Sequence, residues 1–132
     1  MAANQNVAMH HLALDPERKK AQLFKVIQKL KKADAASKII VLTSSNLTAD
    51  YLSLNLNLNG ISAGSINQFK SAMEIKKTTD RFFRGLVKIL VSDKIDIKLK
   101  GRFAIHVINY DMFIPNILYC ETHQSDDVFH NE

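Results

Sequence analysis

The chain has 132 residues, of which 46% are hydrophobic and 23% are charged, and its formal net charge is +5. This length and composition predict one soluble globular domain with a sizeable core. No apolar run approaches the ~20 residues that span a bilayer, and the N-terminus lacks a secretory pattern, so we expect a cytosolic or nuclear protein without membrane contact. Cys120 is the only cysteine, which excludes an internal disulfide and a cysteine-based zinc site.

The positive excess is concentrated between Arg18 and Lys32, where one predicted helix carries seven lysine and arginine residues. Such a face can bind nucleic acid, and more often it is simply solvated. Charge alone does not decide between the two.

The first elements follow from local patterns. Residues 1–14 show no sustained period, and we expect a flexible N-terminus there. Asp15 and Pro16 suit the start of a helix, and apolar residues then follow helical spacing to about Ala33. The apolar run over 38–43 predicts a buried strand.

The next segment is ambiguous, because leucine alternates with serine or asparagine from Leu52 to Gly60. Strict alternation ending in Asn-Gly indicates a strand that enters a hairpin. Against that reading, Tyr51, Leu52 and Leu56 fall at helical spacing, and Gly60 would cap a helix. Buried strands on both sides require a crossover, which is usually helical. We therefore predict a helix.

Three more strands and a helix follow along the chain. The pattern predicts a short strand over 61–66 and a helix from about Lys70 to Gly85. The runs over 87–91 and 103–108 are short, β-branched and nearly continuous, which is typical of strands buried on both faces of a parallel sheet.

The end of the chain predicts a short helix over 115–121 and a polar tail over 123–132. The alternation of strands and helices predicts an α/β fold, an open and mostly parallel sheet with helices on both faces, in a domain over 15–122. Ser92-Asp93 and Asn109–Asp111 follow two of the strands. Open α/β sheets hold their binding sites at such carboxyl ends.

Four runs resemble, in order, motifs of the second RecA-like domain of DEAD-box RNA helicases. They are Ile39–Thr43 with Ser44-Ser45 (motif IV), Phe82–Val91 (F-r-x-G-x-x-x-I-L-V), Ser92-Asp93 (the Thr-Asp of motif V) and Val107–Asp111 (V-I-N-Y-D). The resemblance covers most of residues 20–125 and needs no gaps from about Asn67 to Tyr119. It implies a RecA-like fold.

The chain departs from that family at its functional motifs. Ala72 and Ile75 stand at the Gln and Arg positions of Q-x-x-R, residues 96–100 replace A-R-G-x-D, and residues 121–128 replace the arginine-rich motif VI without any arginine. An arginine finger contributes about 10³–10⁵ in rate to phosphoryl transfer, and no G-x-x-x-x-G-K-[ST] phosphate loop is present. We therefore expect no enzyme activity, no catalytic residues, no cofactor and no metal.

Apolar residues stand where the family has polar groups facing the interdomain cleft. The interface candidates are Ile75, Ile97, Leu99, Met112, Phe113 and Ile114. Exposed apolar patches usually mark contact sites, so these residues predict a protein–protein interface, with a homodimer or another protein as partner. The alternative is that these side chains pack inward.

A weaker hypothesis is RNA binding. The candidates are Ser92, which keeps the motif V hydroxyl, and Lys94, Lys98, Lys100 and Arg102. Such a link would hold phosphates by charge, weakly and without sequence preference. The alternative is a solvated loop.

The histidines do not suggest a metal site. His106 lies within an apolar run and is expected on a strand, and His10, His11 and His130 fall in predicted coil without a companion ligand set.

Stand-alone degenerate helicase modules resemble parts of Tudor-domain proteins of the piRNA pathway. That resemblance implies a scaffold for RNA silencing in the cytoplasm, in ribonucleoprotein granules.

Overall fold

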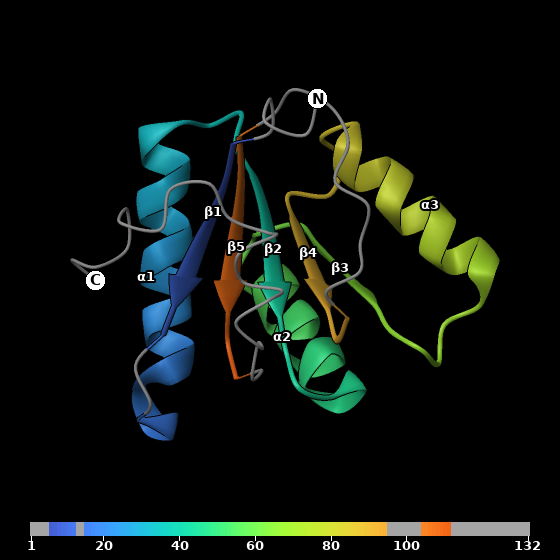
Figure 1. The fold of residues 1–132 in the computed structure, drawn as a ribbon, viewed down its shortest axis with the longest axis horizontal. Coiled ribbons are helices and arrows are strands. Elements are labelled where there is room, and N and C mark those ends of the chain that lie inside the picture. The colour runs from blue at the N-terminus through green and yellow to red at the C-terminus, as the bar shows by residue number, and fades with distance from the viewer. Residues whose placement is uncertain (1–5, 13–14, 95–103, 112–132) are drawn as a thin grey trace.

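The computed structural model describes residues 6–12, 15–94 and 104–111, which form five strands and three helices (Figure 1). In chain order these are β1 (Asn6–His11), α1 (Pro16–Ala33), β2 (Lys38–Leu42), α2 (Asn46–Leu58), β3 (Ala63–Ile66), α3 (Ala72–Phe83), β4 (Ile89–Ser92) and β5 (Ala104–Asn109).

The strands form one sheet in the order β1-β5-β2-β4-β3, and every neighbouring pair is parallel. β2 lies at the centre, where Ile40 is in register with Val107 of β5 and with Leu90 of β4. The predicted parallel sheet is confirmed. The near-continuous apolar runs follow from this arrangement, because a central strand is covered on both faces.

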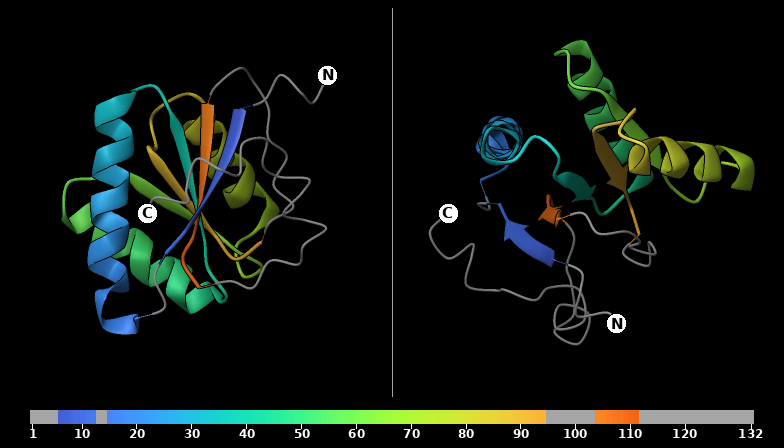
Figure 2. Two further views of the ribbon diagram at one scale, coloured as in Figure 1. Left: turned by 60° about the vertical axis from the view of Figure 1, so that its left-hand side comes forward. Right: turned by 90° about the horizontal axis from the view of Figure 1, so that it is seen from above.

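Helices cover both faces of the sheet, as predicted (Figure 2). Alternate residues of β2 point to opposite sides: Ile39 and Val41 pack with residues of α1 and α2, whereas Ile40 and Leu42 pack with Phe82 of α3. The two buried clusters on either side of the sheet form the core.

Local signals fix the helix ends. The Ser45 hydroxyl accepts a hydrogen bond from Thr48 N at 3.1 Å and caps α2, and Gly60, at φ +81°, follows the end of that helix. Ser71 and Glu74 form a capping box at the start of α3. The prediction of a helix between β2 and β3 is confirmed, because the caps and the parallel crossover outweigh the alternating leucines.

The prediction of a flexible N-terminus is wrong for residues 6–11. They form β1, which pairs with β5 from Asn6↔Ala104 to His11↔Asn109, so the sheet begins before residue 15. The segment lacks a β-branched run, but Met9 and His10 are buried. Its pairing partner lies 98 residues away, so no local pattern reveals the strand. The predictions for 115–121 and 123–132 lie outside the described residues.

None of the described helices is long and apolar enough to cross a membrane.

Candidate functional site

The carboxyl ends of β2, β4 and β5 meet at one edge of the sheet, as the sequence predicts. Thr43 N donates to Ser92 O at 2.9 Å, and Tyr110 N donates to Leu42 O at 2.8 Å. These bonds continue the pairing past the strands. The segments that resemble helicase motifs IV and V are therefore brought together.

Polar groups at this edge bond to each other. The Ser44 backbone N–H donates to Asp111 Oδ1 at 2.7 Å, and the Ser44 hydroxyl donates to Asp111 Oδ2 at 3.0 Å. Both carboxylate oxygens thus accept bonds from one residue of the same chain. The pair joins the segment after β2 to the segment after β5.

Ser92, the proposed RNA-binding hydroxyl, is buried at the end of β4. Its Oγ accepts from Lys94 N at 3.0 Å and lies 3.2 Å from Lys94 O. The hydroxyl therefore shapes the turn after β4 and is turned away from solvent. Lys94 is exposed. The other RNA-binding candidates, Lys98, Lys100 and Arg102, lie outside the described residues.

Ile75 is the one interface candidate within the described residues. It is half-buried on α3 and packs against the core cluster that contains Phe82 and Leu90. At this position the inward-packing alternative describes the side chain better than an exposed patch. Ile97, Leu99, Met112, Phe113 and Ile114 lie outside the described residues.

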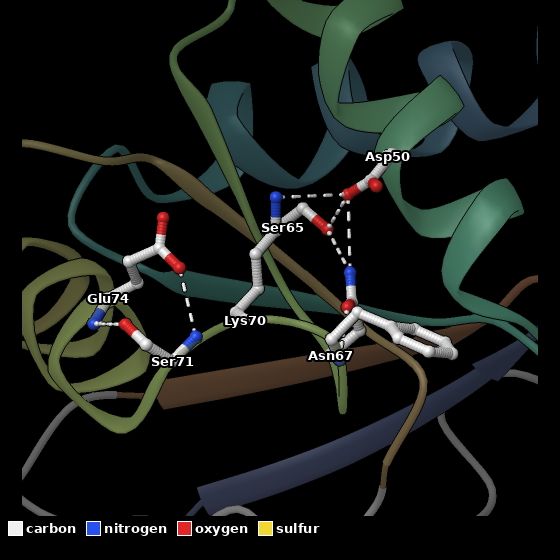
Figure 3. Close-up of polar contacts among 7 residues, drawn as sticks. Asp50, Ser65, Asn67, Lys70, Ser71 and Glu74 are labelled. Atoms are coloured by element: carbon white, nitrogen blue, oxygen red, sulfur yellow. Dashed lines mark hydrogen bonds and ion pairs between the residues drawn. The ribbon is translucent and has the colours of Figure 1, made fainter.

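A second polar network, which the sequence did not indicate, joins α2 to the segment between β3 and α3 (Figure 3). Asp50 Oδ1 accepts from Ser65 Oγ at 2.7 Å and from Asn67 Nδ2 at 3.2 Å. Lys70 Nζ forms an ion pair with the same oxygen at 3.6 Å. The Asn67 side chain is buried, so this network holds the loop that leads into α3.

The outward side of α2 carries a row of exposed apolar side chains, which we call the α2 stripe: Leu47, Tyr51, Leu54 and Leu58. Their exposed fractions are 74%, 51%, 57% and 75%. The opposite side of the same helix buries Leu52 and Leu56 completely. The alternating leucines were the available signal, since residues two apart on a helix cannot all face the core.

The Tyr51 ring at the centre of the α2 stripe is held in place. Its hydroxyl accepts from Lys20 Nζ of α1 at 2.9 Å, and the same ammonium lies 5.2 Å from the ring centroid. The ring therefore has a fixed position on the surface.

Two histidines lie side by side beneath α1. His10 Nε2 and His106 Nδ1 are 3.1 Å apart. Burial, followed by the nearby His106, lowers the pKa of His10 to about 3, and burial also lowers the pKa of His106. The prediction that His106 lies on a strand is confirmed, whereas His10 and His11 lie in β1 instead of coil. Among the described residues, no three His, Cys, Asp or Glu side chains could together hold a metal ion.

Known proteins resemble this chain in their fold only. No family model matches the chain, and no curated protein matches it. Among solved structures, domain 2 of the DEAD-box helicase Mss116p, bound to an RNA duplex, is similar with a TM-score of 0.61 at 15% identity. That match covers 90% of this chain and 47% of the Mss116p chain, so this chain spans about half the length of that neighbour.

Two further structures have the same arrangement. The E. coli DEAD-box protein SrmB, bound to the regulator of ribonuclease activity A, matches with a TM-score of 0.61 at 22% identity, over 89% of this chain and 66% of the other. The C-terminal domain of a Dbp5 variant of S. cerevisiae, bound to Gle1 and IP6, matches with a TM-score of 0.50 at 16% identity, over 80% and 75%. The chain therefore has the α/β fold of RecA-like helicase domains.

Proposed function

We propose that this chain is a catalytically inactive, helicase-C-like module that serves protein–protein contact, including self-association. The observation that carries the proposal is the α2 stripe, four large apolar side chains that are each at least half exposed on one helix. Exposed contiguous apolar surface of this kind marks an interaction site.

The loss of catalysis is argued from the residues themselves. Residues 103–132 contain no arginine, and a neutral or acidic side chain cannot stabilise the charge that develops in phosphoryl transfer. At the carboxyl edge, Asp111 is already engaged by Ser44. An ATPase built on this half would need arginines from outside residues 103–132.

The partners and the cellular location are proposed from resemblance to other proteins. Two of the structural neighbours are bound to protein partners, Gle1 and the regulator of ribonuclease activity A, which supports protein contact as a use of this fold. The resemblance of degenerate helicase modules to piRNA-pathway Tudor proteins, such as Yb, supports a scaffold in cytoplasmic ribonucleoprotein granules.

The test is the oligomeric state of the full chain. Size exclusion with light scattering, run from about 10 µM to 1 mM, is expected to show a mass that rises from monomer toward dimer as the loaded concentration increases. A monomer mass over the whole range, together with no shift when the chain is mixed with lysate fractions of its source cells, would contradict the proposal. A thermal melt with ATP and Mg²⁺ tests the loss of catalysis. We expect no stabilisation, and a rise in Tm would show that the chain binds the nucleotide and would contradict this part of the proposal.

Weak RNA binding is the second candidate, favoured by the RNA duplex bound to the Mss116p domain. Fluorescence anisotropy with a single-stranded RNA tests it at 20 mM and 200 mM salt. Binding that weakens steeply with salt supports phosphate contacts. No binding at 20 mM salt removes this candidate.

A further inference from the structure

The α2 stripe has the spacing of a coiled-coil seam. Its members are separated by four, three and four residues, which is the d-a-d-a alternation of a heptad pattern. They extend over three helical turns, a length of about 16 Å. A row with this spacing is suited to another helix, because a and d side chains insert between those of a facing helix.

We propose that the α2 stripe packs against α2 of a second copy of this chain, antiparallel, about a twofold axis perpendicular to the helix. This rests on the proposed function and adds to it the surface and the geometry. The stripe is symmetric about a point between Leu52 and Ser53. An axis through that point pairs Leu47 with Leu58 of the second copy, and Tyr51 with Leu54 of the second copy.

The charge distribution is compatible with a second copy as the occupant. The chain carries a net charge of +5, and α1 alone has seven lysine and arginine residues. The basic surfaces of two copies therefore repel each other. α2 has one charged residue, Asp50, and Asp50 Oδ1 already accepts from Ser65 and Asn67 and pairs with Lys70. α2 itself therefore adds little like charge to a contact between two copies, and the cation held against the stripe is the Lys20 ammonium bonded to Tyr51.

The antiparallel orientation follows from the helix ends and from Tyr51. Antiparallel helices place opposite ends of their dipoles beside each other. A parallel pair would place each Tyr51 against the other, together with the Lys20 ammonium bonded to its hydroxyl. The antiparallel pair instead places each Tyr51 ring against a leucine.

The interface is small. Four side chains per copy bury less than the roughly 800 Å² per partner of a standard interface, so we expect a dissociation constant on the order of 10–100 µM. Such a contact forms where the chain is concentrated.

Sedimentation equilibrium of the full chain tests the surface, with Leu54→Asp and Leu58→Asp against the matched control Met73→Asp. Met73 is 79% exposed and lies on α3, outside the stripe. We expect the stripe variants to weaken dimerisation at least tenfold, the control to dimerise like wild type, and all three to keep the wild-type far-UV spectrum. A wild-type dimer that persists in Leu54→Asp overturns this inference and leaves self-association standing. A monomeric wild type overturns both this inference and self-association.

Disulfide trapping in a Cys120→Ser background tests the orientation. We expect Leu47→Cys mixed with Leu58→Cys to give a cross-linked heterodimer, because a bridge requires Cα atoms within about 7 Å, and Leu47→Cys alone to stay unlinked. Efficient cross-linking of Leu47→Cys alone would overturn the antiparallel geometry.

Discussion

Ser44 donates twice to Asp111, through its backbone N–H to Oδ1 at 2.7 Å and through its hydroxyl to Oδ2 at 3.0 Å. The two residues lie 67 positions apart in the chain. Their bond fastens the exit of β2 to the exit of β5, at the edge where open α/β sheets place ligands. Here both oxygens of the Asp111 carboxylate bond to another residue of the same chain. Removal of the carboxylate should therefore change the stability of the fold.

Replacing Asp111 by alanine is expected to lower the free energy of unfolding by about 1 kcal/mol, because it removes two hydrogen bonds to a charged group that is exposed to solvent. Urea unfolding of the two proteins measures the difference. The control is Asp80→Ala, which removes an exposed ion pair with Lys76 on α3, and it should cost less than about 0.5 kcal/mol. Equal costs for the two variants would show that the Ser44–Asp111 pair contributes no more than an exposed ion pair.

Close packing of α3 on β3 requires the glycine at position 64. A Cβ on Gly64 would lie 2.6 Å from Thr78 Cγ2, so Gly64→Ala is expected to destabilise the fold by about 1–3 kcal/mol through overpacking. Thr78→Ser removes that methyl group and should recover part of the loss. A double-mutant cycle by urea unfolding should give a coupling of at least about 0.5 kcal/mol. Strictly additive costs would contradict the contact.

His10 should make stability depend on pH. Its pKa is about 3 in the folded chain and 6.5 at its ordinary value, so between these values the unfolded chain binds a proton that the folded chain does not. The stabilisation is complete above pH 6.5 and is lost as pH falls toward 3, by about 1.4 kcal/mol per pH unit. Urea unfolding at pH 7 and pH 4.5 measures this loss.

His10→Leu is expected to reduce the difference between those two pH values, whereas His11→Gln, at an exposed position, should reduce it only slightly, because His11 is a lesser cause of the lowered His10 pKa. Carboxylates titrate in both variants, and so does His106, whose pKa is also lowered by burial, so the comparison between variants isolates His10. An unchanged pH slope in His10→Leu would refute the assignment.

Most of the fold could be predicted from the sequence, because the strongest signals are local. The run Lys38–Leu42 is continuously apolar after its first residue and forms the buried β2. Asp15 and Pro16 start α1 where predicted, and the capping serine and Gly60 bound α2 despite its strand-like alternation. These features depend on neighbours in the chain, which a sequence displays directly.

The remainder depends on distant residues. β1 is a strand because β5 lies beside it, and the Asp50 network depends on Ser65 and Asn67. Nothing in the local pattern at residues 6–11 or 50 encodes those partners. The α2 stripe was missed for a different reason: the leucines served only to decide between a strand and a helix, and they were not divided between the two sides of the predicted helix.

The position of β5 between β1 and β2 also determines when the sheet can be completed during synthesis. β1 leaves the ribosome first among the described strands, and β5 leaves it last. Until Ala104–Asn109 emerges, the nascent chain carries an N-terminal strand with no neighbour, and the central strand is paired along one side only. The last strand enters the sheet between the first strand and the central one, so the sheet cannot be completed before this strand has left the ribosome.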